Sequence, residues 1–140
     1  MKRPATIIIG FIAGLAISGV LGDLIIAASS SAGRISSAWS ISKAEKFYAG
    51  GNFSESLNEY EKALGKVKPD NKKLIAKIKN NQALNVFAIA DKAKDKSQIK
   101  KSLELFNESL KIYEEIKDTQ GAAEVNVNIG EAKKALKELK

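Results

Sequence analysis

Hydrophobic residues recur at intervals of three and four along most of the chain. Three such series occupy residues 53–67, 99–113 and 125–139. Positions spaced in this way lie on one face of an α-helix, and the intervening positions here are mostly Lys, Glu and Asn. No comparable alternation of period two is present. The pattern therefore predicts an all-α fold without a sheet.

Helix-breaking and capping residues separate these series. Breaks are predicted at Gly50-Gly51, at Pro69-Asp70, at "KDKS" (94–97) and at Asp118-Thr119. Five helices result, and the short connections between them predict antiparallel neighbours. The predicted helices cover residues 36–49, 53–67, 71–92, 97–117 and 119–139.

The first part of the chain has a different pattern, because residues 5 to 28 contain a single ionisable group, Asp23. A helix of this length spans about 36 Å, slightly more than the hydrocarbon core of a bilayer. Asp23 costs about 3 kcal/mol at most, which the Ile, Leu, Val and Phe residues of the segment outweigh. We therefore predict a single-pass transmembrane anchor (1–28), a linker (29–35) and a helical domain (36–140).

One face of the predicted transmembrane helix carries only small residues. Gly10, Gly14, Ser18 and Gly22 stand four positions apart, and Asp23 follows them directly. Small residues allow two helices in a membrane to approach closely. We expect this face to pack against a second transmembrane helix, with Asp23 at the interface with water or bonded to the partner.

A cleaved secretory signal is the alternative for this segment, with cleavage after residue 28 or residue 32. The apolar stretch is longer than the usual core of a signal peptide, so its length favours an uncleaved anchor. Lys2 and Arg3 precede the span closely. This positive cluster favours a cytoplasmic N-terminus and places the helical domain on the exported side.

Two nonapeptides of the helical domain match each other. "SLNEYEKAL" (56–64) and "SLELFNESL" (102–110) share two small residues, an aromatic between them and a closing Leu. They resemble the second helix of a tetratricopeptide repeat. Upstream, Ala44 and Phe47 match the small residue and the tyrosine of the family's first helix. Downstream, "NIG" (128–130) resembles the first helix of a further repeat.

The resemblance implies about two and a half repeats that form an antiparallel helical array. The chain also departs from the family: Ser40 and Lys43 replace an apolar pair, Lys133 replaces a tyrosine, and the matching nonapeptides are 46 residues apart. The extra residues are expected to lengthen the middle helices. The expected core residues of the repeats are Ala44, Phe47, Ser56, Tyr60, Ala63, Ser102, Phe106, Ser109, Ile129 and Gly130. The expected lining of a groove for a protein partner is Glu45, Tyr48, Gln82, Asn85, Ile89 and Glu131.

Composition argues against several classes of activity. The chain has neither Cys nor His, which removes the commonest metal ligands and the commonest general base. No phosphate-binding loop motif occurs. The net charge of +7 comes almost entirely from lysine, whereas nucleic-acid recognition favours arginine. We expect no enzyme, no cofactor, no metal site, no small-molecule substrate and no nucleic-acid partner.

A lysine-rich stretch (66–79) has two interpretations, a docking patch for acidic partners or a solvated helix start. Leu74, Ile75 and Ile78 give this stretch an ordinary buried face, which favours the second interpretation.

These features predict a membrane-anchored module for protein–protein interaction, an adaptor or assembly factor for a membrane complex. Its protein partners would contact both the helical domain and the transmembrane helix. A permanent small accessory subunit of a larger membrane complex is the first alternative. A secreted helical domain with a cleaved signal is the second.

Overall fold

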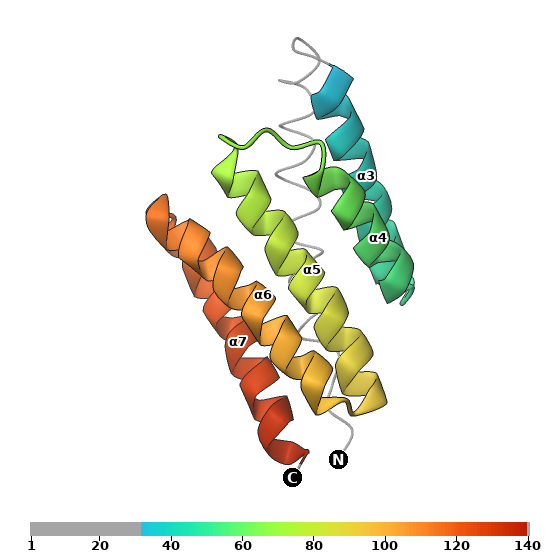
Figure 1. Cartoon of the computed structure of the whole chain (residues 1–140), viewed down its shortest axis with the longest axis vertical. Helices are drawn as coiled ribbons and strands as arrows, with labels where there is room; N and C mark the ends of the chain where they lie inside the picture. Colours follow the sequence, from blue (N-terminus) through green and yellow to red (C-terminus); the bar gives the residue numbers. More distant parts are fainter. Residues whose placement is uncertain (1–31, 140) are drawn as a thin grey trace. The chain divides into compact units, whose positions relative to one another are not determined.

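The computed structural model describes residues 32–139, which form helices joined by short turns. For this part of the chain the prediction of an all-α fold with five helices is confirmed (Figure 1). The helices are α3 (Ala32–Ala49), α4 (Phe53–Leu64), α5 (Lys72–Ala93), α6 (Lys96–Glu115) and α7 (Thr119–Glu138).

Two helix ends differ most from the prediction. Helix α3 begins at Ala32, so it includes much of the segment assigned to a linker. The serines of this segment suggested a loop, but nothing beyond Gly33 in the first turn disfavours a helix there. Helix α4 ends at Leu64 rather than at residue 67, and Gly65 is its C-cap residue.

The predicted transmembrane segment (5–28), including its face of small residues and Asp23, lies outside the described residues. Within residues 32–139, no helix combines the length and the apolar character needed to cross a membrane.

The chain divides into two compact units, of which the first ends at Lys66 and the second begins at Val67. In the first unit, helices α3 and α4 pack against each other as a hairpin. Its described buried apolar residues are Ile41, Ala44, Tyr48, Tyr60 and Ala63. The ring of Tyr48 also meets that of Phe53 edge-on, with the centroids 5.2 Å apart.

The second unit contains α5, α6 and α7 in succession (Figure 1). Helix α6 lies between the other two, since it packs extensively against both while α5 touches α7 at only a few places. Its largest fully buried apolar side chains are Ile78, Leu84, Ile99, Phe106 and Val125.

The extra residues between the two nonapeptides lie in long helices, as expected. Helix α5 has 22 residues and α6 has 20, whereas α4 has 12. Together α5 and α6 have 12 residues more than α3 and α4, which is about three helical turns, and these turns enlarge the second hairpin while its connecting turn stays short.

Candidate interaction surface

The two nonapeptides occupy equivalent places, each on the second helix of a hairpin. Their small and aromatic positions are all completely buried: Ser56, Tyr60 and Ala63 on α4, and Ser102, Phe106 and Ser109 on α6. The aromatic ring thus fills the interior of each hairpin, and the small residues on either side of it lie where bulk is excluded. These six residues are core residues and not a contact surface.

Polar bonds support the packing of the second nonapeptide. The Ser109 hydroxyl donates to the Ala76 carbonyl of α5 at 2.7 Å, and the Ser102 hydroxyl donates to the Ile99 carbonyl at 2.7 Å. The first of these bonds joins two helices inside the unit. Because both hydroxyls are satisfied, their burial carries little desolvation cost.

The other expected core residues lie at different depths. Ala44 and Ile129 are buried and Phe47 is half-buried. The prediction for Gly130 is wrong, because this glycine is exposed and a Cβ built on it would meet nothing within 4 Å. The glycine on α7 that packs closely is Gly121, where a Cβ would overlap the Tyr113 ring.

Three helix junctions share one turn that sequence reasoning did not identify. In each, a residue with positive φ follows the helix: Gly51 (77°), Lys94 (57°) and Lys117 (57°). The next residue donates its N–H to the carbonyl five positions back, at 2.8 Å for Asn52 and 2.9 Å for both Asp95 and Asp118. This is the Schellman ending of a helix.

The same Asn or Asp also begins the following helix. Asp95 accepts hydrogen bonds from the N–H groups of Ser97 and Gln98, and Asp118 accepts one from Gly121. At these two junctions one Lys-Asp pair therefore ends one helix and caps the next, which reverses the chain within two residues. The residue pair is Gly-Asn at the first junction and Lys-Asp at the other two, so the Asn or Asp after the left-handed residue is what the three junctions share.

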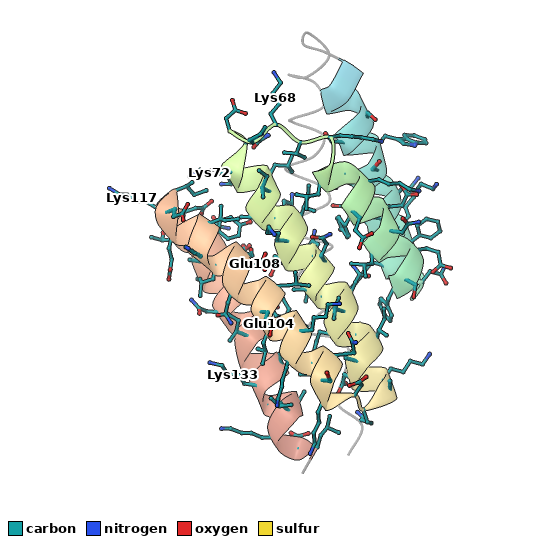
Figure 2. The ribbon with its side chains drawn as sticks, viewed as in Figure 1. Lys68, Lys72, Glu104, Glu108, Lys117 and Lys133 are labelled. Carbon is teal, nitrogen blue, oxygen red and sulfur yellow. The ribbon has the colours of Figure 1, made fainter. Side chains whose placement is uncertain are left out.

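Carboxylates of α6 and the α6–α7 turn neutralise much of the lysine-rich stretch. Lys72 lies 3.3 Å from Glu115, Lys79 lies 2.6 Å from Glu108, and Lys73 lies 2.7 Å from Asp118. Figure 2 shows Lys72 and Lys117 at the same end of the second unit, where α5 begins and α6 turns into α7. These lysines hold helices together, which supports the interpretation as a solvated helix start.

Helix α5 carries an unusual run of buried amides, "NNQALN" (80–85). The Asn128 amide of α7 donates to the Asn80 side-chain oxygen at 3.0 Å, inside the unit. The Asn85 amide donates to the Asn81 carbonyl at 2.9 Å, while its own oxygen, Oδ1, has no hydrogen-bond partner among the described residues. Polar groups thus occupy part of the interior between α5 and α7.

The residues expected to line a partner groove come from both units and differ in exposure, and the groove itself stays a prediction. Tyr48, Gln82 and Asn85 are buried. Ile89 is 37% exposed on α5, while Glu131 on α7 and Glu45 on α3 are half-buried. These positions were assigned to a groove from the resemblance to tetratricopeptide repeats, whose first helices line the concave face.

Two buried or nearly buried carboxylates have perturbed acidity. The hydrogen bond from Lys62 (2.9 Å) holds the pKa of the Glu59 carboxyl below its ordinary value, against the effect of burial, and Lys43 at 3.2 Å adds to the lowering. The backbone N–H of Gly121 lowers the pKa of Asp118, and Lys73 adds to it. Both carboxylates have a structural role: the Glu59–Lys43 ion pair joins α4 to α3, and the Asp118–Lys73 ion pair joins the α6–α7 turn to α5.

Burial raises the pKa of the phenols of Tyr48 and Tyr113. Within residues 32–139, no three acidic side chains gather closely enough to hold a metal ion.

Comparison of the chain with protein-family models, with curated proteins and with solved structures finds no match. The likeness to tetratricopeptide repeats consequently stays a prediction that rests on the residues quoted above.

Proposed function

We propose that this chain is a membrane-anchored, tetratricopeptide-like module for protein–protein interaction, an adaptor or assembly factor for a membrane complex. The supporting observation is the equivalent burial of the two nonapeptides, Ser56-Tyr60-Ala63 and Ser102-Phe106-Ser109, each on the second helix of a hairpin. Repeated hairpins with a common packing motif are typical of helical-repeat proteins, which bind other proteins.

The anchor enters this proposal from the sequence of residues 5–28, long and apolar enough to span a bilayer. Its face of small residues supports a second contact inside the membrane. The helical domain and the anchor would therefore bind the same partner complex at two levels. Linking two weak contacts in this way raises the overall affinity.

Co-purification in a mild detergent tests this function. We expect the full chain to retain one or more membrane proteins. Gly14→Leu should reduce their recovery by about tenfold or more, because a bulky side chain blocks close helix approach. The matched control is Leu15→Ala, on another face of the same segment, which should leave recovery unchanged.

The stoichiometry of the recovered proteins separates the two membrane-bound alternatives. Partners that exchange when competitor is added indicate an adaptor, and one partner in constant ratio indicates a permanent accessory subunit. Equal recovery of the same partners by both variants would show that the small face is no interface.

A further inference from the structure

The largest exposed apolar side chain of the described residues is that of Trp39. It lies on α3 and is 72% exposed, although tryptophan is usually well buried in a folded domain. It is also the only tryptophan of the chain. The buried face of α3 is formed by other residues, including Ile41 and Ala44, so Trp39 points away from the core of the hairpin.

The residues that share this outward line of α3 are basic. Lys43 and Lys46 stand four and seven positions after Trp39, and both are exposed. Residues with this spacing lie along one side of a helix. The Lys43 ammonium is 3.2 Å from the Glu59 carboxylate and 5.7 Å from the centre of the Phe47 ring. Lys43 is thus already paired within the hairpin, and the surface feature that points to a membrane is Trp39 itself, because tryptophan is enriched at the boundary between a bilayer and water.

The chain length between the apolar segment and α3 is short. Residues 29–31 alone separate residue 28 from the first residue of α3, a span of about 14 Å at full extension. Trp39 lies two helical turns further on, about 10 Å along α3. The indole is thus within reach of the headgroup layer when residues 5–28 are inserted.

We propose that Trp39 inserts into the headgroup layer of the membrane that holds residues 5–28 and thereby fixes α3, and the hairpin, close to the bilayer surface. This inference rests on the membrane anchoring of the proposed function. The occupant of the Trp39 surface is lipid, and a protein partner at this position is the competing outcome.

Fluorescence of the full chain tests the proposal, because Trp39 is the only indole. The chain is reconstituted into vesicles of phosphatidylcholine and phosphatidylglycerol, and flotation first establishes that it is membrane-bound. Phosphatidylcholine brominated near the headgroup should then remove on the order of half of the emission, since interfacial tryptophan lies at that depth. Aqueous iodide should quench the vesicle-bound chain several-fold less than free tryptophan.

The matched control moves the indole to the far end of the same helix. Ala49 is exposed and is the last residue of α3, about 15 Å along the helix from Trp39. In the double variant Trp39→Phe/Ala49→Trp, iodide should quench strongly and brominated lipid weakly. This pattern would support a specific lipid contact at Trp39.

Two results would overturn the inference. Strong iodide quenching of Trp39 in chains that float with the vesicles would place it in water, free for a protein partner. Equal quenching of both positions by brominated lipid would indicate general adsorption of the domain. Failure to float would instead contradict the membrane anchor of the proposed function, so the two failures are distinguishable.

Discussion

The α3–α4 hairpin and the α5–α6 hairpin carry the same packing motif, but the hydrogen bonds around that motif and at the helix caps differ. Tyr60 and Phe106 are both completely buried. However, Ser102 donates a hydrogen bond within α6, whereas the Ser56 hydroxyl has no partner among the described residues. Likewise, Asp95 caps α6 with two hydrogen bonds, while the Asn52 side chain makes no such bond to α4. The size pattern of the motif is therefore common to both hairpins, and its hydrogen bonding is not.

The two hairpins also differ in length and in how their polar groups are paired. In the second hairpin, Ser109 and Asn80 make hydrogen bonds to neighbouring helices inside the unit. In the first hairpin, the buried Glu59 carboxylate instead pairs with two exposed lysines, Lys62 on its own helix and Lys43 on α3. We infer that apolar packing forms both hairpins and that polar groups fix the alignment of their helices.

Removal of either central aromatic should have the largest effect. Tyr60→Ala and Phe106→Ala should each lower the free energy of unfolding of their unit by about 3–5 kcal/mol, the usual cost of truncating a buried aromatic. Urea denaturation of the full chain in detergent, followed by circular dichroism, measures the change. Glu61→Ala and Glu104→Ala, exposed positions on the same two helices, are the controls and should stay within about 0.5 kcal/mol of the parent. If truncation of only one of the two aromatics cost almost no stability, the two hairpins would not be packed in an equivalent way.

The two glycines of α7 should respond in opposite directions to the same substitution. Gly121→Ala should destabilise the second unit by about 1–3 kcal/mol, because the new methyl group overlaps the Tyr113 ring. Gly130→Ala should stabilise it by up to about 1 kcal/mol, because the site is open and alanine favours the helix. Thermal unfolding of both variants gives the sign of each change in stability. A stabilising effect of Gly121→Ala would contradict the close packing of Tyr113 against Gly121.

The buried amide side chains of α5 should differ in how much each contributes to the stability of the second unit. Asn80→Ala leaves the Asn128 amide without its acceptor and should cost about 1–3 kcal/mol. Asn85→Ala removes the amide that donates to the Asn81 carbonyl together with an oxygen that has no described partner and leaves no other side chain unpaired, so it should cost less. A double-mutant cycle of Asn80 and Asn128 isolates their coupling, which should be about 1 kcal/mol. A coupling of zero would show that the bond does not align α5 with α7.

Acid should weaken both units through one carboxylate each. The pKa values of Glu59 and Asp118 are lowered by folding, so their stabilising contributions are complete above the ordinary values of 4.5 and 3.8. Each contribution is lost as the pH falls through the depressed pKa of the folded state. Glu59→Gln and Asp118→Asn should therefore reduce the loss of stability on acidification. Unfolding free energies measured from neutral pH to below pH 4 test this, and acid dependence identical to that of the parent would refute the assignment.

Hydrophobic periodicity, together with breaking and capping residues, was sufficient to predict the five helices and most of their ends. Polar capping residues and glycines are local signals, so breaks such as Gly50-Gly51 could be located from neighbouring residues alone. The nonapeptide match likewise identified completely buried positions such as Tyr60 and Phe106, since their spacing reflects one helix face.

The surface could not be predicted equally well. Gln82 and Asn85 are polar, yet they are buried, and burial of a polar residue depends on tertiary packing that residue type does not encode. Gly130 and Gly121 are indistinguishable by residue type, and only the position of Tyr113 decides which one packs closely. The left-handed residues Lys94 and Lys117 were also missed, since lysine carries no signal for positive φ.

Membrane extraction followed by intact mass measurement tests the central claim, that the chain's own N-terminal segment tethers the helical domain. We predict that after an alkaline wash the protein stays in the membrane fraction, at a mass that includes residues 5–28. A released, shorter chain that begins after residue 28 or residue 32 would contradict this account and establish the secreted alternative.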